Sequence, residues 1–396
     1  MNILKPDYFD QFACIGGDCP NTCCAGWGDI TIDEESLTKY NKVQGPFRER
    51  LQENIDQKKK QFRLKEHACP FLDEEHLCEI YKELGEQSMC YTCRAYPRTR
   101  DDYKELVQLN LTISCPEVAR LLLEHKETIT FQYFEQDTLD CKPTVVVPKI
   151  QQKLFDAYFE TQGVAIDLMQ KKDISLSKRL LTTMFYIKNI QKTLDRNMLG
   201  ETVKMNQQYS NPEYINAIVS QMDTIKIEPL LYIDLVFLLL NSDICTKMLS
   251  QIALNNDEYN NIYKKYIFNK SRDHLKEVIE TYEPEFEDYM RERTHEYENY
   301  FVYMIYETYM KTIKEKNVLK ANVMNNIGFV LIKVIGLFAW IENGKSLTTK
   351  DNALIMSSYD KAIIHGKQVY EDTFRKISSA KYSQMSYQAA LIRTTL

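Results

Sequence analysis

Nine of the eleven cysteines in this 396-residue chain lie within its first 115 residues, at spacings that suit metal binding. They form four blocks: Cys14, Cys19, Cys23 and Cys24; Cys69 and Cys78; Cys90 and Cys93; and Cys115. Thiolates bind soft and borderline metals, and a short spacing lets one loop supply two ligands. We therefore predict a metal centre ligated by these nine cysteines.

The number of metal sites stays open, because nine thiols exceed the four ligands of a single site. Two full sites would use eight thiols, whereas a single cluster would lie among structural thiols. His67 and His76 each lie two residues before a cysteine, so a mixed nitrogen and sulfur site is a further arrangement. Zinc and an iron–sulfur cluster both suit such ligands.

The simplest alternative treats the cysteines as buried, reduced side chains that pack as small hydrophobes. We favour this interpretation for Cys141 and Cys245, which lie outside the four blocks. Cys90 and Cys93 have the spacing of a redox pair, but no thioredoxin-like pattern surrounds them. Glycines and prolines between the other cysteines indicate loops wrapped around ions, so metal binding remains the prediction.

The composition is that of a globular protein and restricts the classes of partner. Hydrophobic residues make up 44% of the chain, charged residues make up 27%, and the formal net charge is -6. This balance lacks the basic surface that attracts a nucleic acid backbone, so we expect no nucleic acid partner.

Two features argue against export and membrane insertion. The apolar runs 235–240 and 327–341 are shorter than the roughly 18 residues of a membrane span, and Lys333 interrupts the second. The N-terminal residues lack the pattern of a signal peptide. We therefore expect a cytoplasmic protein without a membrane partner, in which thiols stay reduced.

Hydrophobic spacing predicts short elements before the break at 141–148 and long helices after it. Leu109, Leu111 and Ile113 alternate with polar neighbours as in a strand, and Ile30 and Ile32 hint at another. Helical patterns cover the following ranges: 49–60, 116–126, 150–159, 177–194, 229–254 and 297–312.

The segment 141–148 marks the predicted domain boundary. Two proline dipeptides flank a β-branched run there, which a helix disfavours. We predict a mainly α fold: a loop-rich, cysteine-rich metal-binding domain with a few short strands over 1–141, then a helical domain over 149–396. The helical domain would provide a substrate or partner surface.

The order and context of the cysteine blocks resemble the flagellin lysine N-methylase family. The matching segments are Ile3-Leu4-Lys5-Pro6-Asp7-Tyr8, Cys23-Cys24-Ala25-Gly26-Trp27, Cys69-Pro70-Phe71-Leu72, Leu77-Cys78-Glu79-Ile80-Tyr81, Cys90-Tyr91-Thr92-Cys93-Arg94-Ala95-Tyr96-Pro97-Arg98 and Ser114-Cys115-Pro116-Glu117. A weaker similarity lies at 298–303. The N-terminal part is also similar to a broader family of zinc- or iron-chelating proteins.

The resemblance implies a protein-lysine N-methyltransferase that acts on flagellin before its export. It implies S-adenosylmethionine as the methyl donor and a [4Fe–4S] cluster held by the cysteines, with zinc as the alternative metal. Flagellin is then the expected protein partner, and the resemblance says nothing of oligomeric state.

The residues themselves add two negative observations on methyl transfer. No glycine-rich turn between a strand and a helix marks a Rossmann-like donor site. The CxxxCxxC loop of radical adenosylmethionine enzymes is also missing, because Cys14, Cys19 and Cys23 have longer spacings. Polar transfer to a neutral lysine amine is therefore the default expectation.

Several side chains are candidates for lining the reaction site. Tyr96, Arg98 and Tyr300 are the catalytic candidates, and Arg94 is a candidate for binding the donor carboxylate or offsetting thiolate charge. Tyr300 belongs to an acidic, tyrosine-rich stretch over 283–309 that could receive a lysine-bearing partner. The competing interpretation places its glutamates on a solvated face and its tyrosines in a core.

Three classes of function follow from the sequence. The first is a lysine methyltransferase with an iron–sulfur centre, which rests on the resemblance. The second is a metal-binding or redox module without transferase activity, and the third uses structural zinc to present a helical interaction surface. The last two need only the cysteines.

Overall fold

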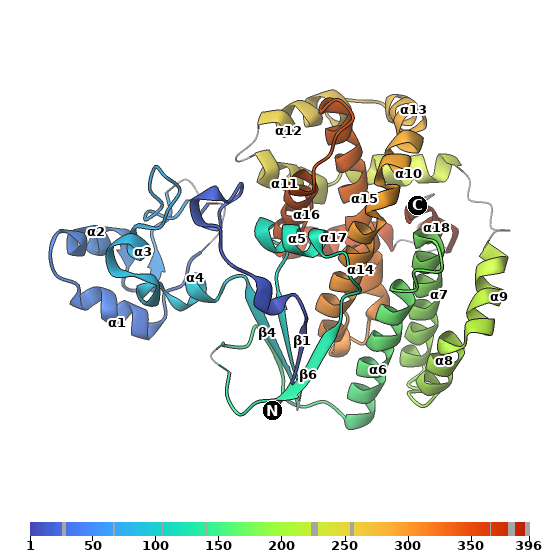
Figure 1. Ribbon diagram of the computed structural model, residues 1–396, viewed down its shortest axis with the longest axis horizontal. Coiled ribbons are helices and arrows are strands. Elements are labelled where there is room, and N and C mark those ends of the chain that lie inside the picture. Colours follow the sequence, from blue (N-terminus) through green and yellow to red (C-terminus); the bar gives the residue numbers. More distant parts are fainter. Residues whose placement is uncertain are drawn as a thin grey trace.

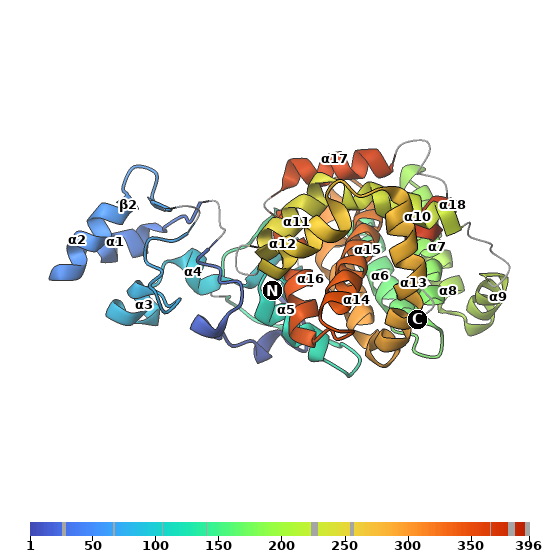
Figure 2. The ribbon, with the colours of Figure 1, turned by 90° about the horizontal axis from the view of Figure 1, so that it is seen from above.

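The computed structural model describes residues 1–25, 29–65, 68–104, 106–139, 141–222, 229–253, 257–364, 366–378 and 385–392. Trp27 and His67, singled out in the sequence, lie outside these residues. A small part containing α1 to α4 projects from a larger helical part in both views (Figures 1 and 2). The predicted mainly α fold, with short strands confined to the N-terminal part, is confirmed.

The strands are β1 (Asn2–Pro6), β2 (Ile55–Asp56), β3 (Gln61–Phe62), β4 (Arg98–Tyr103), β5 (Leu106–Leu111), β6 (Phe131–Glu135) and β7 (Val145–Val147). The helices are α1 (Glu34–Lys42), α2 (Pro46–Asn54), α3 (Glu79–Leu84), α4 (Tyr91–Ala95), α5 (Pro116–Glu124), α6 (Gln152–Met169), α7 (Leu176–Asp195), α8 (Glu201–Ser210), α9 (Pro212–Met222), α10 (Pro229–Leu240), α11 (Asp243–Ala253), α12 (Asp257–Ile262), α13 (Arg272–Met290), α14 (Thr294–Thr308), α15 (Val318–Glu342), α16 (Thr349–Ile364), α17 (Lys367–Ile377) and α18 (Met385–Leu391).

The projecting part, here called the cysteine lobe, comprises the described residues between 13 and 95. Its own core is small and consists of Ile30, Ile32, Leu37, Tyr40, Leu51, Ile55, Phe62, Cys69, Phe71, Ile80 and Cys90. The expected helix over 49–60 ends at Asn54, because Ile55 and Asp56 pair with β3 instead. The strand expected at Ile30 and Ile32 is reduced to an isolated bridge between Thr31 and Gln61, although both isoleucines are buried.

A five-stranded sheet joins the cysteine lobe to the helices, in the order β6-β1-β5-β4-β7. β1 is parallel to β5, and β4 is antiparallel to β5. The predicted strand is confirmed at Leu109 and Leu111, whereas Ile113 lies in the turn after β5. β7 lies in the segment expected to separate two domains, and it pairs with β4.

One large core extends from Tyr8 to Ile392 and includes α5, the sheet and the long helices. We call the helices of this core, together with the sheet that packs on them, the helical body. The core contains residues on both sides of the segment 141–148, so it continues across the expected boundary. The domain division at that segment stays a prediction. Helices α6 and α7 confirm two predicted ranges, whereas the range 229–254 forms two helices separated at Asn241 and Ser242.

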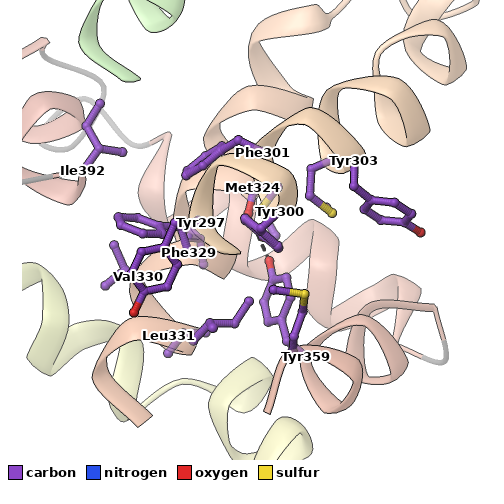
Figure 3. Close-up of a cluster of buried hydrophobic side chains, with 14 of the residues drawn as sticks. Tyr297, Tyr300, Phe301, Tyr303, Met324, Phe329, Val330, Leu331, Tyr359 and Ile392 are labelled. Atoms are coloured by element: carbon purple, nitrogen blue, oxygen red, sulfur yellow. Dashed lines mark hydrogen bonds between the residues drawn. The ribbon is translucent and has the colours of Figure 1, made fainter. Parts of the chain in front are cut away.

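Helix α15 is the central helix of the body. It has 25 residues and is long and apolar enough, by length and composition alone, to cross a membrane, contrary to the expectation for run 327–341. Its apolar window is 94% buried within the protein, which is the environment of a core helix. A Cβ at Gly328 would overlap the Tyr300 hydroxyl and the Tyr359 ring, so glycine permits this close packing. Figure 3 shows both tyrosines within the buried cluster.

The acidic stretch over 283–309 agrees with the competing interpretation for its tyrosines but not for four of its glutamates. Its tyrosines lie in the core, as Figure 3 shows for Tyr297, Tyr300 and Tyr303. Four of its glutamates are buried rather than solvated, and each has a cationic partner: Glu283, Glu287, Glu296 and Glu298. The stretch therefore does not present these groups to a lysine-bearing partner.

Lys333 is the buried cation that neutralises two of these glutamates, and its removal tests the pairing. Its Nζ lies 2.9 Å from Glu283 Oε1 and also bonds Glu287. We expect Lys333→Met to lower the free energy of unfolding by about 3–5 kcal/mol, because two buried carboxylates lose their counterion. Lys345→Met, which breaks an exposed pair with Glu285, should cost less than about 1 kcal/mol. Equal losses in urea unfolding would contradict this account.

Candidate metal centre

The nine clustered cysteines surround two adjoining spaces. The inner cavity has a volume of about 40 Å³ and is lined by Cys23, Cys24, Cys69, Cys78, Cys90 and Cys93, with apolar side chains and Tyr96 between them. The outer cleft measures about 950 Å³ and adds Cys14, Cys19 and Cys115 to its walls. Blocks that are 101 residues apart in sequence, from Cys14 to Cys115, thus meet in one region.

Electrostatic contacts divide the thiols into two groups. The inner group comprises Cys24, Cys69, Cys78, Cys90 and Cys93. The charges of Cys24 and Cys90 raise the pKa of each of the other three thiols. The outer group comprises Cys14, Cys19, Cys23 and Cys115. The neighbouring Cys23 and Cys24 link the two groups. Of the arrangements left open by the sequence, this division corresponds to the one with two groups of ligands.

Short helices position three of the thiols. Cys78, Cys90 and Cys115 are the N-cap residues of α3, α4 and α5. At this position backbone N–H groups point at the side chain, and the helix dipole favours a thiolate. Burial raises the pKa of Cys115 to about 11, although the N–H groups of Val118 and Glu117 oppose this shift.

In each of two neighbouring thiol pairs, the pKa of one thiol is lowered instead of raised. The hydrogen bond with Cys23 lowers the pKa of Cys24 to about 7 against the effect of burial. Cys90 and Cys93 have their Sγ atoms 3.5 Å apart, and this hydrogen bond lowers the pKa of Cys90. Both pairs therefore favour one thiolate, the form that binds metals.

Asp33 fixes the start of α4 and thereby the second pair. Its carboxylate caps α1 by accepting from Ser36 N at 3.1 Å, and it also accepts from Tyr91 N at 2.7 Å. Tyr91 directly follows Cys90. One carboxylate thus holds two helices of the cysteine lobe in a fixed relation.

A buried lysine from the helical body holds the first cysteine loop. Lys361 of α16 donates from Nζ to Asn21 Oδ1 at 2.7 Å and to Asn21 O at 3.1 Å. Asn21 in turn donates from Nδ2 to Gln251 O of α11 at 3.1 Å. Burial lowers the pKa of Lys361, whereas the nearby Cys19, Cys23 and Cys115 favour its charged form.

Sequence reasoning missed Lys361, Asn21 and Gln251. A lysine in a helix carries no sign of a partner 340 positions away. Asn21 lies between Cys19 and Cys23, and that position is the one signal that could have suggested a role.

The structure brings three of the four non-cysteine candidates together. Arg94, Tyr96 and Arg98 all line the outer cleft. Arg94 donates to Gln87 O at 3.3 Å, and the Arg98 guanidinium lies 5.4 Å from the centre of the Phe12 ring. Tyr300 does not line the cleft, because it is 1% exposed and its hydroxyl donates to Asn325 O inside the helical body.

Of the other residues singled out in the sequence, one lines the cleft and two lie away from it. His76 lines the outer cleft. Cys141 packs beside β1 and β5, and Cys245 is fully buried in α11. Their surroundings are those of small hydrophobic side chains.

The ligand set fits a thiophilic metal in its chemistry. The inner cavity is walled by soft thiols and apolar groups, which select soft metals over hard cations that need oxygen ligands. Among the described residues, no three Cys, His, Asp or Glu side chains are close enough to hold a single ion as they stand. The thiols instead face one another across a cavity.

Serine replacements test the assignment of ligands. We expect Cys69→Ser, Cys90→Ser, Cys93→Ser and Cys14→Ser each to lower the metal content of anaerobically purified protein, since serine is a poor ligand for soft metals. Cys245→Ser should leave the metal content unchanged. Elemental analysis per mole of protein makes the comparison, and unaltered metal in the first four variants would mean that the ligands lie elsewhere.

Comparison with known proteins gives one matching family. A model described as the FliB lysine N-methylase C-terminal domain matches residues 162–391. The flagellar biosynthetic protein FliU of Salmonella muenchen is 32% identical over 138 residues, which are 33% of this chain and 81% of that protein.

Two further relatives are named lysine-N-methylase, from Salmonella typhimurium and Salmonella choleraesuis. Each is 28% identical over 214 residues, or 51% of this chain and 51% of the relative. The match thus spans about half the length of these two relatives. No solved structure matches the chain.

Proposed function

We propose that this chain, which belongs to the FliB lysine N-methylase family, methylates lysine side chains of flagellin. The reaction would take place in the cytoplasm, with S-adenosylmethionine as the methyl donor. The observation that carries the proposal is the outer cleft. Its volume of about 950 Å³ is at the upper end of small-molecule sites, which span roughly 300–1,000 Å³. A nucleoside donor and an extended lysine side chain could occupy it together.

The walls of the cleft carry groups that suit the methyl donor. Arg94 and Arg98 supply guanidinium groups that suit the donor carboxylate. Glu117 also lines the cleft, although Arg120 engages both of its oxygens, at 2.8 and 2.6 Å. Tyr96 adds a ring and a hydroxyl between the two spaces.

The reaction requires a neutral lysine amine. At neutral pH lysine is almost fully protonated, because its reference pKa is about 10.4, so the ammonium must first lose a proton. The amine lone pair then forms the new N–CH₃ bond while the S–CH₃ bond of the sulfonium breaks. The electron pair of that bond stays on sulfur, and S-adenosylhomocysteine leaves as a neutral thioether. An enzyme that holds the amine nitrogen, the methyl carbon and the sulfur in line gains much of its rate acceleration from this alignment.

The inner group of thiols supports a cluster more than a single ion. A tetrahedral zinc site draws four sulfurs to about 2.3 Å from one point, whereas these thiols line a cavity. Four of the five thiols of Cys24, Cys69, Cys78, Cys90 and Cys93 would hold a [4Fe–4S] cluster, and structural zinc is the alternative. When bound there, a cluster would supply a redox-active group beside the cleft.

Mass spectrometry of flagellin tests the transferase proposal. We expect purified protein and adenosylmethionine to add mass increments of one methyl group to unmodified flagellin. Flagellin whose lysines were chemically acetylated beforehand should gain none. If metal-loaded protein produces no increments, the chain is a metal-binding module without this transferase activity, and the proposal fails.

Arginine variants test whether the cleft receives the donor. We expect Arg94→Ala and Arg98→Ala to raise the KM for adenosylmethionine by roughly 10-fold or more, since each would lose a charge-assisted hydrogen bond. Arg375→Ala is the matched control, because Arg375 lies on α17 in an exposed pair with Asp372. A change in KM of equal size in all three variants would exclude a specific role for the cleft arginines.

A further inference from the structure

A row of three hydroxyl groups runs from the cleft to a buried carboxylate. Tyr96 OH lies 3.1 Å from Ser114 Oγ, which lies 2.9 Å from Thr112 Oγ1. Thr112 Oγ1 then lies 3.0 Å from Asp360 Oδ2 on α16. Tyr96 lines both spaces, whereas Thr112, Ser114 and Asp360 are buried.

The direction of these hydrogen bonds follows from the number of protons available. Asp360 accepts from Thr112, and a hydroxyl has only one proton to donate. Thr112 must therefore accept from Ser114, and Ser114 must accept from Tyr96. All three hydroxyls thus donate toward Asp360, which is the arrangement that passes a proton inward.

The backbone holds this row in place from both sides. Thr112 N donates to Pro97 O at 2.8 Å, which fixes residue 112 beside the segment that carries Tyr96. Ile113 N donates to the hydroxyl of Tyr303 on α14 at 3.2 Å. The row therefore connects Tyr96, which follows α4, and the segment after β5 with two helices of the body.

Asp360 has the properties of a proton acceptor near neutral pH. Burial, followed by the charge of Glu307, raises the pKa of Asp360 to about 7, while Thr112 and Lys311 oppose the shift. The other titratable groups that face Asp360 are Tyr96, Tyr300, Tyr303 and Tyr359, and burial raises the pKa of all four tyrosines, so they stay neutral. Enzymes tune carboxylates in this way for general base catalysis.

We propose that Tyr96, Ser114, Thr112 and Asp360 form a proton relay that deprotonates the lysine to be methylated. The inference rests on the proposed function, because it needs a lysine ammonium in the cleft. Of the four residues, only Tyr96 would touch the substrate, so Ser114, Thr112 and Asp360 act through it.

The proton balance of the relay is simple. The lysine ammonium gives one proton to the Tyr96 oxygen as Tyr96 passes its own to Ser114, Ser114 to Thr112, and Thr112 to the Asp360 carboxylate. The products are a neutral amine and a protonated Asp360. After the methylated lysine leaves, the proton returns along the same hydroxyls to water in the cleft.

The test compares hydroxyl deletions within the relay with deletions outside it. Thr112→Val and Ser114→Ala interrupt the row but keep the carboxylate, and Asp360→Asn removes the acceptor. Thr183→Val and Ser358→Ala are matched controls, because each removes a buried hydroxyl that has no hydrogen-bond partner among the described residues. Methyl transfer to a flagellin peptide is measured against pH, together with metal content and melting temperature.

We expect each relay variant to transfer methyl groups roughly 100-fold more slowly at neutral pH, in line with general base catalysis. The deficit should shrink as the pH approaches the lysine pKa of about 10.4, where solvent removes the proton. It should also shrink for a peptide with S-aminoethylcysteine at the target position, since that amine is less basic. The two controls should match the unmodified protein.

Two outcomes would overturn the relay while leaving the proposed function intact. One is full activity of Thr112→Val or Ser114→Ala at neutral pH. The other is a deficit that is the same at every pH and for both amines, because a structural role alone would cause it. An unmodified protein that transfers no methyl group at any pH would instead refute the proposed function, and the relay with it.

Discussion

The cysteine lobe contains too little apolar core to fix its loops by burial alone. Eleven buried side chains form that core, and two of them are cysteines. A core this small leaves a narrow margin of stability, which natural small domains often widen with disulfides or a metal. All described cysteines are free thiols, and we propose that a bound metal stabilises the lobe. Metal binding and folding of the lobe should therefore be coupled.

The position of the lobe on the helical body creates the cleft. Lys361 and Gln251 hold Asn21 between the first cysteines, and Asp360 receives the hydroxyl row beside them. The matched family model covers residues 162–391, whereas the clustered cysteines all precede it. Every residue that lines the cleft precedes the matched range, whereas Lys361 and Gln251 inside that range hold one of them, Asn21, in place.

Local patterns in the sequence predicted the parts of this structure that depend on near neighbours. The strand at Leu109 and the helices at α5, α6 and α7 follow from hydrophobic spacing, and the cysteine blocks indicated which loops meet. Long-range pairings left no local pattern. The buried glutamates of α13 and α14 resemble a solvated face, because their partners Lys333 and Arg179 lie on other helices.

The same reason explains which site residues were missed. Tyr96 and its arginine neighbours adjoin the Cys90 block, so proximity in sequence identified them. Asp360 and Lys361 come from a helix that lies far along the chain, and only the fold brings them to the thiols. Tyr300 resembled a substrate-binding tyrosine in sequence, whereas its hydroxyl donates to a backbone carbonyl of α15.

The central claim is that lysine reaches the cleft between the cysteine lobe and the helical body. Photo-crosslinking tests it directly: a flagellin peptide with a photoreactive group at the target lysine is bound in the presence of S-adenosylhomocysteine, and labelled residues are mapped by mass spectrometry. We predict labels on cleft residues such as Tyr96, Arg98 and Ile15. Labels confined to α8 and α9, which carry none of the residues lining the cleft, would contradict the account.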